Sequence, residues 1–218
     1  RGLINVGPDW QSLAPSPGAE FVAHDESAGV RRDFVVTRES LRTLSVDGKT
    51  IAQTPAADAW IAAMVQEFVR RTGTSATTRA SQIVERDDVA GLLAEAKQIA
   101  IPNVRVRYLH AGFAHVDSAG RASFIRDGAS LLGPGYERAD FLLALPPTWR
   151  TDLDALAAVY REAAALDASD AIEHVLRVAP PPRPLPFALR SAVETLIARL
   201  ASTDRRAALR AYYFDARP

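Results

Sequence analysis

The sequence contains no cysteine, and this absence removes several kinds of chemistry at once. A thiolate nucleophile, a cysteine-ligated zinc ion, an iron–sulfur cluster and a disulfide all require that residue. A chain without disulfides must be stabilised by its apolar core. The composition fits a reducing compartment better than a secreted scaffold, so we expect a cytoplasmic protein.

Lysine is almost as scarce, because only Lys49 and Lys97 occur and all other basic residues are arginines. The 26 basic and 26 acidic residues balance, so the formal net charge is zero. Capture of nucleic acid or of an anionic membrane surface requires an excess of positive charge on one face. We therefore expect neither a nucleic-acid nor a membrane partner. The preference for arginine and alanine is typical of a bacterial genome rich in GC.

Recognisable site motifs are also absent. No apolar run approaches the roughly 20 residues that a membrane-spanning helix requires. The chain has no Gly-x-Ser-x-Gly nucleophile motif, no phosphate-binding or dinucleotide-binding glycine loop, and no His-Glu-x-x-His zinc motif. We also detect no internal repeat. The sequence therefore predicts neither a metal site nor a cofactor.

The apolar content of the chain is sufficient for a sizeable core. It has 218 residues, of which 48% are hydrophobic and 24% are charged. The run Phe141–Leu145 stands out, since five apolar residues lie between Asp140 and the pair Pro146-Pro147. A short unbroken apolar run is typical of a strand buried on both faces, and proline cannot continue a strand ladder. We predict that Phe141–Leu145 is the central strand of a sheet.

Three hairpins are predicted before this strand, and the third joins Phe113–Asp117 to Arg121–Ile125 through the turn Ser118-Ala119-Gly120. Leu41–Val46 and Lys49–Gln53 flank Asp47-Gly48, and Asp-Gly favours the type I′ turn of a tight hairpin. Residues 104–117 begin with apolar residues and arginines in alternation, which is the period of a half-buried strand. The segment 104–117 is therefore predicted to form the second hairpin.

Helices are predicted where apolar residues recur three and four positions apart. Thr54 and Pro55 are expected to begin a helix that ends at Gly73, because threonine caps helices, proline suits their first turn and glycine terminates them. A polar loop is predicted at 72–81. Asp87 is then expected to cap a second helix.

The remainder of the chain is predicted to be mostly helical. The proline-rich run 180–186 must be extended, and it favours a stiff spacer before the last helices or, alternatively, a ligand for an aromatic groove. Strands, helices, strands and a helical C-terminal tail together predict an α+β fold with one mixed or antiparallel sheet packed with amphipathic helices. We expect one domain over residues 1–218, with residues 1–54 as a candidate β-rich lobe.

The densest group of chemically active side chains lies in the predicted hairpin 104–117. Alternation along its strands would place His110, His115 and Asp117 on one face. Imidazole and carboxylate groups that converge in this way can transfer protons. One interpretation is therefore a small metal-independent enzyme, a hydrolase or a cyclase, with these three residues in its active site. The other interpretation is that they hydrogen-bond locally at the rim of the hairpin.

One stretch of the chain carries a family resemblance. It combines a Gly-x-Ser loop, a glycine–aromatic–glutamate approach, an apolar run, a Pro-Pro-x-Trp motif and a helix with Leu-Ala: Ser123–Gly133, Gly135-Tyr136-Glu137, Phe141–Leu143, Pro146-Pro147-Thr148-Trp149, and Leu156-Ala157 with Tyr160. Over residues 123–160 the chain resembles the suppressor-of-fused-like domain. The resemblance implies an α/β protein-binding module and carries no catalytic residues with it.

The interpretation that these observations favour is a non-catalytic protein-binding module, such as an adaptor, an inhibitor or an immunity-type partner in a bacterial system. Its partner would be another protein. Aromatic side chains dominate the binding energy of many interfaces. The candidates for such anchors are Tyr136, Trp149, Tyr212, Tyr213 and Phe214. For Trp149 the competing interpretation is that its side chain closes the core.

Overall fold

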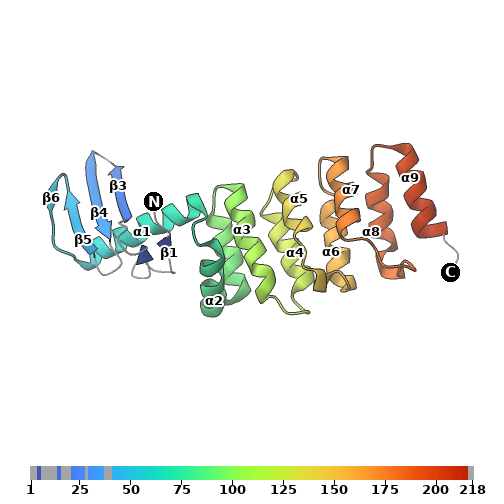
Figure 1. Cartoon of the computed structure of the whole chain (residues 1–218), viewed down its shortest axis with the longest axis horizontal. Helices are drawn as coiled ribbons and strands as arrows, with labels where there is room; N and C mark the ends of the chain where they lie inside the picture. The colour runs from blue at the N-terminus through green and yellow to red at the C-terminus, as the bar shows by residue number, and fades with distance from the viewer. Residues whose placement is uncertain (1–3, 6–13, 16–20, 28, 37–40, 216–218) are drawn as a thin grey trace. The chain divides into compact units, whose positions relative to one another are not determined.

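The structure of the chain is a computed structural model that describes residues 4–5, 14–15, 21–27, 29–36 and 41–215. The chain forms two compact units, unit 1 over Arg1–Tyr108 and unit 2 over Leu109–Pro218. The fold is α+β as predicted, with antiparallel strands in the first part and a helical C-terminal part (Figure 1). Unit 1, which contains the strands, extends to Tyr108. The β-rich lobe considered from the sequence ended at residue 54.

The described strands all belong to unit 1: β1 (Ile4–Asn5), β2 (Ala14–Pro15), β3 (Phe21–Ser27), β4 (Val30–Val36), β5 (Leu41–Val46) and β6 (Lys49–Thr50). β1 pairs with β2, and β3, β4, β5 and β6 form a four-stranded antiparallel sheet in that order. The hairpin predicted at Asp47-Gly48 is confirmed, because these residues have φ of 49° and 75° and β5 pairs with β6 across them.

Helix α1 (Pro55–Thr72) is the helix predicted for this segment, and it lies against the sheet (Figure 1). Thr54 Oγ1 accepts a hydrogen bond from the Ala57 N–H, and Gly73 ends the helix at φ 67°. Side chains from both elements form one buried cluster: Phe34, Leu44, Ala57, Ile61, Val65 and Val69. Each large apolar side chain buried in this way contributes roughly 1.5–3 kcal/mol to folding.

Helix α2 (Ala76–Gln98) begins earlier than predicted. The loop expected at 72–81 is helical from Ala76, because Ala76, Ala80 and Ile83 are buried at helical spacing. The threonines and serines between them hide this apolar stripe in the sequence. Polar composition alone therefore led to the wrong prediction for this segment.

A kink divides α2 at Asp88, which has φ 60° and ψ −166°. The Asp88 Oδ1 atom accepts a hydrogen bond from the Ala90 N–H at 2.6 Å, so Asp88 caps the second part of the helix. The sequence predicted a cap at this place but assigned it to Asp87. The Asp87 side chain instead accepts hydrogen bonds from Arg86.

Neither the hairpin predicted at 104–117 nor the one predicted at 113–125 is present, and Arg121–Ile125 is helical. Residues 102–112 form helix α3 (Pro102–Gly112), and a 3₁₀ turn, η2, follows over Phe113–His115. Val104 and Tyr108 are both buried and lie four positions apart, which fits a helix as well as their alternation fits a strand. Pro102 at the helix start decides between the two patterns, because proline suits the first turn of a helix.

The central strand predicted at Phe141–Leu145 is also wrong, because this run begins inside helix α5 (Tyr136–Leu143). Phe141, Leu142 and Leu145 are nonetheless buried, as the sequence indicated. A run of five apolar residues does not by itself distinguish a buried strand from a short buried helix. The helix starts at Tyr136, and Pro146 and Pro147 follow it as the predicted stop.

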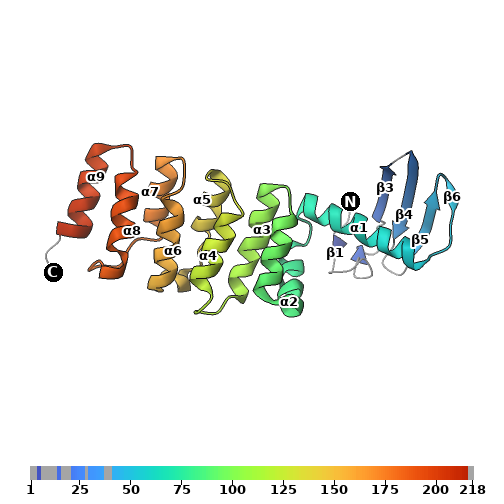
Figure 2. The same cartoon turned by 180° about the vertical axis from the view of Figure 1, so that it is seen from behind.

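Unit 2 contains further helices that stand side by side in chain order (Figures 1 and 2). Besides α5 they are α4 (Arg121–Ser130), α6 (Leu153–Ala163), α7 (Ser169–Val178), α8 (Phe187–Ala198) and α9 (Thr203–Arg210), with the 3₁₀ turn η3 (Pro147–Trp149) and the π-helical turn η4 (Ala211–Asp215). α4 packs on α6 and α6 packs on α8, while α5 packs on α7. The helices of unit 2 therefore lie in two rows.

The described part of unit 2 consists of successive helix pairs at a nearly constant spacing. The first helices of the pairs begin 32 and 34 residues apart, at Arg121, Leu153 and Phe187. The second helices begin 33 and 34 residues apart, at Tyr136, Ser169 and Thr203. This spacing corrects the conclusion from the sequence that the chain has no internal repeat. A repeated helix pair is the unit from which stacked-repeat folds are built.

Candidate functional site

The structure does not assemble the three residues of the predicted acid–base site on one hairpin face. His110 lies on α3, where its ring stacks on Phe113 and Phe141 at centroid distances of 6.1 and 6.3 Å. Burial of the imidazole lowers the pKa of His110, although Asp140 opposes this effect. His115 closes the 3₁₀ turn and is half-buried. The geometry that suggested a shared site depended on a strand period that this segment does not have.

Asp117, the third residue of that prediction, is exposed in the turn before α4. Its Oδ1 atom accepts a hydrogen bond of 2.8 Å from the Gly120 N–H, which stabilises the turn locally. Within the residues that the structure describes, no three histidine, aspartate or glutamate side chains are grouped so that they could hold a metal ion. No helix in the same residues combines the length and the apolar character that crossing a bilayer demands.

Trp149, one of the predicted interface aromatics, is a core residue. Its side chain is 3% exposed and makes edge contacts with Phe113 and Phe124, at centroid distances of 5.1 and 6.5 Å. The Arg121 guanidinium lies 5.3 Å from its ring centroid. Trp149 therefore closes the core of unit 2, which was the competing interpretation from the sequence.

The other predicted aromatics differ in exposure. Tyr136 begins α5 and is 80% exposed. Tyr212, Tyr213 and Phe214 lie on the π-helical turn η4, where Tyr212 is 48% exposed, Phe214 is half-buried and Tyr213 is largely buried. Tyr213 lines the groove described below.

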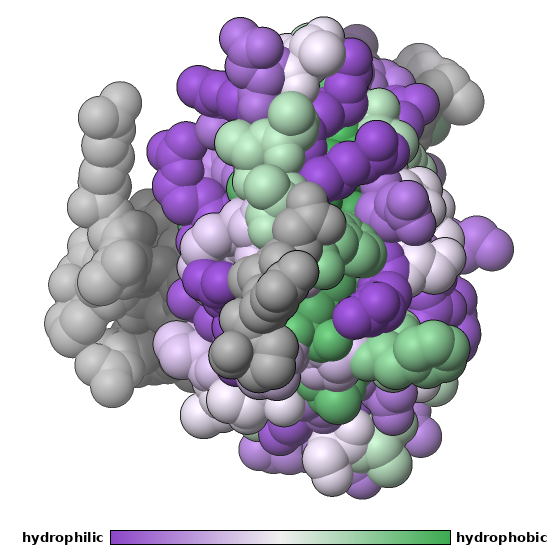
Figure 3. Space-filling model, turned by 90° about the vertical axis from the view of Figure 1, so that its right-hand side faces the viewer, coloured by the Kyte–Doolittle hydropathy of each residue, from purple (hydrophilic) through white to green (hydrophobic). Residues whose placement is uncertain are grey.

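The candidate site is a groove of about 510 Å³ between α7 and α9, which we call the α7–α9 groove. Side chains from α7, the start of the proline-rich run, α9 and η4 line it: Glu173, Leu176, Arg177, Pro180, Arg205, Ala208, Leu209 and Tyr213. Figure 3 views unit 2 from the side of α9, where apolar side chains lie between hydrophilic ones. The volume is within the range of roughly 300–1,000 Å³ that is usual for binding sites.

Helix α7 supplies one wall of the groove because its sequence is strongly amphipathic. Ile172, Val175 and Leu176 are buried against unit 2. Glu173 and Arg177 lie four positions apart beside this apolar face, and their side chains form an ion pair of 3.2 Å. The same spacing therefore places apolar residues in the core and charged residues at the rim of the groove.

Helix α9 supplies the other wall, although none of its side chains is buried. Ser202 caps it by accepting a hydrogen bond from the Arg205 N–H. The Arg205 side chain then reaches across to α7 and donates to Glu173. Glu173 thus pairs with one arginine of its own helix and with one arginine of α9. This shared carboxylate joins the two walls of the groove.

The turn η4 contributes Tyr213 to the lining of the α7–α9 groove. Burial raises the pKa of the Tyr213 phenol, and the Arg183 charge partly opposes the effect. Arg183 comes from the proline-rich run, and its guanidinium lies 3.8 Å from the ring centroid of Tyr212. The proline-rich run 180–186 was predicted to be a spacer between helices. In the structure it connects α7 to α8 and also contributes Pro180 to the groove.

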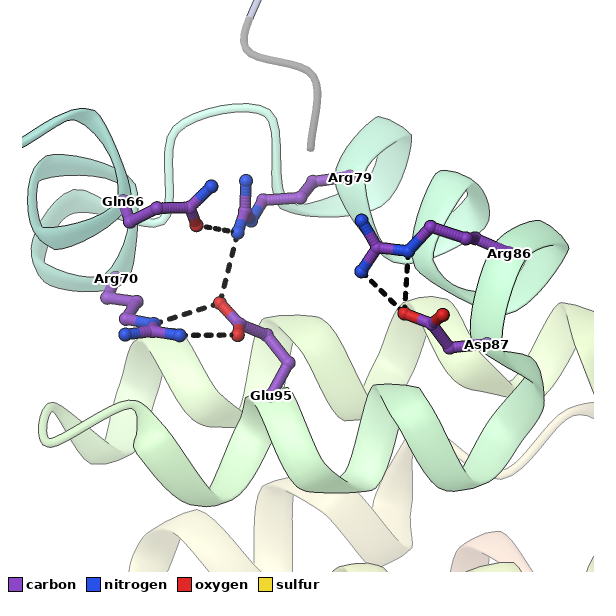
Figure 4. Close-up of polar contacts among 6 residues, drawn as sticks. All are labelled: Gln66, Arg70, Arg79, Arg86, Asp87 and Glu95. Atoms are coloured by element: carbon purple, nitrogen blue, oxygen red, sulfur yellow. Dashed lines mark hydrogen bonds and ion pairs between the residues drawn. The ribbon is translucent and has the colours of Figure 1, made fainter. Parts of the chain in front are cut away.

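A second polar cluster lies in unit 1, where α1 and both parts of α2 meet (Figure 4). Arg70 donates two hydrogen bonds to the Glu95 carboxylate, at 3.0 and 2.7 Å, and Arg79 donates to the same carboxylate at 3.2 Å. Arg79 also donates to Gln66. Since the side chain of Arg79 is only 3% exposed, this ion pair is largely shielded from solvent. The Glu95 carboxylate thus connects α1 with the two parts of α2.

The electrostatics of this cluster follow from its burial and its charges. Burial acts to raise the pKa of Glu95, but the hydrogen bond from Arg70 and the charges of Arg79 and Arg70 outweigh it and hold that pKa below its ordinary value. Burial raises the pKa of Tyr108 beside the cluster to about 12. Charged groups held so firmly by one another are typical of a structural ion pair. We therefore regard the α7–α9 groove as the better candidate site.

The sequence contained signals for the groove that depend on recognising the repeat. The second helices of the pairs each have an acidic residue in the first turn, and these residues lie 33 and 34 positions apart: Glu137, Asp170 and Asp204. Apolar residues recur at the same spacing five positions later: Leu142, Val175 and Leu209. A search at this period would have aligned α7 with α9.

Comparisons of the chain with models of protein families, with curated proteins and with solved structures find no match. The resemblance of residues 123–160 to the suppressor-of-fused-like domain therefore stays a prediction.

Proposed function

We propose that this chain is a non-catalytic protein-binding module, an adaptor, inhibitor or immunity-type partner in the cytoplasm of a bacterium, and that its partner binds in the α7–α9 groove. The observation that carries the proposal is the composition of the groove. Leu176, Leu209 and Tyr213 provide an apolar floor, and charged side chains of α7 and α9 surround it. An apolar core with a polar rim is the usual anatomy of a protein–protein interface.

The repeated helix pairs of unit 2 support this proposal. Repeats of this kind place equivalent helices next to one another and bind partners on the surface that they create together. α5 packs on α7, whereas the next helix of that row, α9, leaves a groove beside α7. An apolar side chain of a partner could therefore contact α7 and α9 at once. Tyr213 would add the aromatic contact that binding hot spots favour.

A selection from a library of random peptides displayed on phage, with the whole chain as bait, tests this proposal. We expect enriched peptides whose affinity falls at least about tenfold in the variant Ala208→Trp. Ala208 is exposed and lines the groove, so an indole at this position would occupy the space that the partner needs. Fluorescence anisotropy of the labelled peptides gives the Kd values.

The matched control is Ala207→Trp, which adds the same side chain to the neighbouring exposed residue that does not line the groove. This variant should bind the selected peptides with wild-type affinity. The proposal is wrong if no peptide is enriched, or if both tryptophan variants bind every enriched peptide as the wild type does.

A further inference from the structure

The charges around the α7–α9 groove do not balance. Its lining contains two arginines, Arg177 and Arg205, and one carboxylate, Glu173. Both arginines pair with this carboxylate, one at each of its oxygens. One unit of positive charge in the lining is therefore left without a counter-charge. Arg183, stacked on Tyr212 beside the groove, adds a further cation to the same end of unit 2.

The exposure of these side chains makes the excess charge available to a partner. The side chains of Arg177 and Arg205 are 72% and 59% exposed, whereas that of Glu173 is 23% exposed. The carboxylate thus lies deeper, between the two guanidinium groups, and the donors that face solvent are those of arginine. Each guanidinium group carries five N–H donors, and its contact with Glu173 uses only some of them.

We propose that the segment bound in the groove is acidic and amphipathic. Its carboxylates would accept hydrogen bonds from Arg177 and Arg205, and its apolar side chains would cover Leu176, Leu209 and Tyr213. This inference rests on the proposed function, because it specifies the chemistry of the same partner. The guanidinium group of arginine can donate two parallel N–H···O bonds to one carboxylate of the partner. A neutral amide or a lysine of the partner could not accept this pair of bonds in the same way.

The same charges would also reject the wrong partners. A basic segment would bring a third cation next to two arginines that already share a single carboxylate, and like charges in an interface are strongly unfavourable. Because Arg177 and Arg205 are exposed, their attraction for a partner acts through water and is screened by salt. Binding should therefore weaken as the ionic strength rises, mainly through slower association.

The experiment uses the same peptide selection and examines the charge of the enriched sequences. With the wild-type chain, aspartate and glutamate should be enriched next to apolar residues. In the double variant Arg177→Glu/Arg205→Glu, the affinity of these peptides should fall at least about tenfold, and a new selection should enrich basic sequences instead. Circular dichroism of the variant checks that its helices are intact.

The matched control is Arg126→Glu/Arg190→Glu, which makes the same change in net charge at two exposed arginines of α4 and α8 outside the groove. Its affinity for the acidic peptides should stay within about twofold of wild type. Three outcomes overturn the inference: enriched peptides without excess acidic residues, equal losses in both double variants, or displacement of the peptides by millimolar inorganic phosphate, which would indicate a small-anion site. If peptides without excess acidic residues still lose affinity in Ala208→Trp, the proposed function stands and only the acidic character of the partner is wrong.

Discussion

Phe141 packs directly on the backbone of Gly128, so closely that a Cβ atom on this glycine would lie 2.8 Å from Phe141 Cζ. The contact joins α5 to α4 in the core of unit 2. Phe141 cannot easily move away, because its ring also stacks on Phe113 at a centroid distance of 5.2 Å and on His110. Glycine is required here by packing and not by backbone conformation.

Gly128→Ala is therefore expected to destabilise the chain, although alanine is the better helix former. The gain in helix propensity is at most about 1 kcal/mol, whereas forcing a methyl group into a well-packed core costs about 1–3 kcal/mol. The midpoint of urea unfolding should shift downwards. The control is Gly133→Ala, where a Cβ would meet no atom within 4 Å. A Gly128→Ala variant as stable as the control would contradict the packing described here.

Asp88 combines backbone strain with a capping hydrogen bond, and two substitutions separate these effects. Its φ of 60° and ψ of −166° belong to a region that only glycine occupies readily. Asp88→Gly should relieve the strain and lose only a few tenths of a kcal/mol from the cap, for a net gain of about 1 kcal/mol. Asp88→Ala keeps the strain and loses the cap, and should destabilise the chain by about 1 kcal/mol. Thermal unfolding of both variants should place the wild type between them.

Glu95→Gln tests the buried ion pairs of unit 1. Removing one partner of such a pair leaves the remaining charges uncompensated, so we expect the unfolding free energy to fall by about 3 kcal/mol. This is the lower end of the range for buried ion pairs, because Arg70 reaches solvent. Since the pKa of Glu95 is lowered in the folded state, its contribution is complete above the ordinary carboxylate pKa and is lost as the pH falls through the folded value. The exposed pair of Arg126 and Asp127 provides the control, because Asp127→Asn should change stability by less than about 0.5 kcal/mol.

His110→Phe is expected to alter the pH dependence of stability. Burial lowers the pKa of His110 in the folded chain, so the unfolded chain binds the proton first as the pH decreases. The wild type should then lose stability as the pH falls through the ordinary histidine value of about 6.5 towards the folded pKa. Phenylalanine can occupy the same aromatic stack and does not titrate. As the pH falls over this range, the variant should therefore become more stable relative to the wild type. A constant difference would show that His110 does not titrate differently in the two states.

Trp149→Ala and Tyr136→Ala should separate the core aromatic from the exposed one. Trp149 is almost fully buried, and its loss should cost about 3–5 kcal/mol. Tyr136 is 80% exposed, so its loss should change stability by less than about 0.5 kcal/mol. Chemical unfolding monitored by far-UV circular dichroism measures both. Peptide affinity measured on Tyr136→Ala would then report on binding alone, without a change in folding.

Local signals were sufficient for several elements. Helix α1 could be predicted because Thr54, Pro55 and Gly73 specify its ends within a few residues of chain. The turn at Asp47-Gly48 could be predicted because its two positive φ values depend on those two residues alone. In both cases the energy that decides the conformation lies in neighbouring residues. The α+β class followed from such elements.

The wrong predictions share a physical cause. Val104 and Tyr108, like Phe141 and Leu142, are apolar residues in short runs whose spacing is compatible with a strand or a helix. The choice depends on what covers them. Phe141 is covered by Gly128 and Phe113. The residues next to Phe141 in the sequence do not indicate that these two will cover it. Correct burial was therefore inferred together with the wrong backbone conformation.

The candidate site shows the same division. The sequence by itself determined that the stretches containing Glu173 and Tyr213 are helical, because the apolar periodicity that indicates a helix is a relation within a few residues. Only the tertiary structure decided that Arg205 reaches Glu173 and that Leu176 and Leu209 border one groove. Residues more than 30 positions apart meet there because successive helix pairs stack, and the direction in which a pair stacks is set by the packing of its whole apolar face.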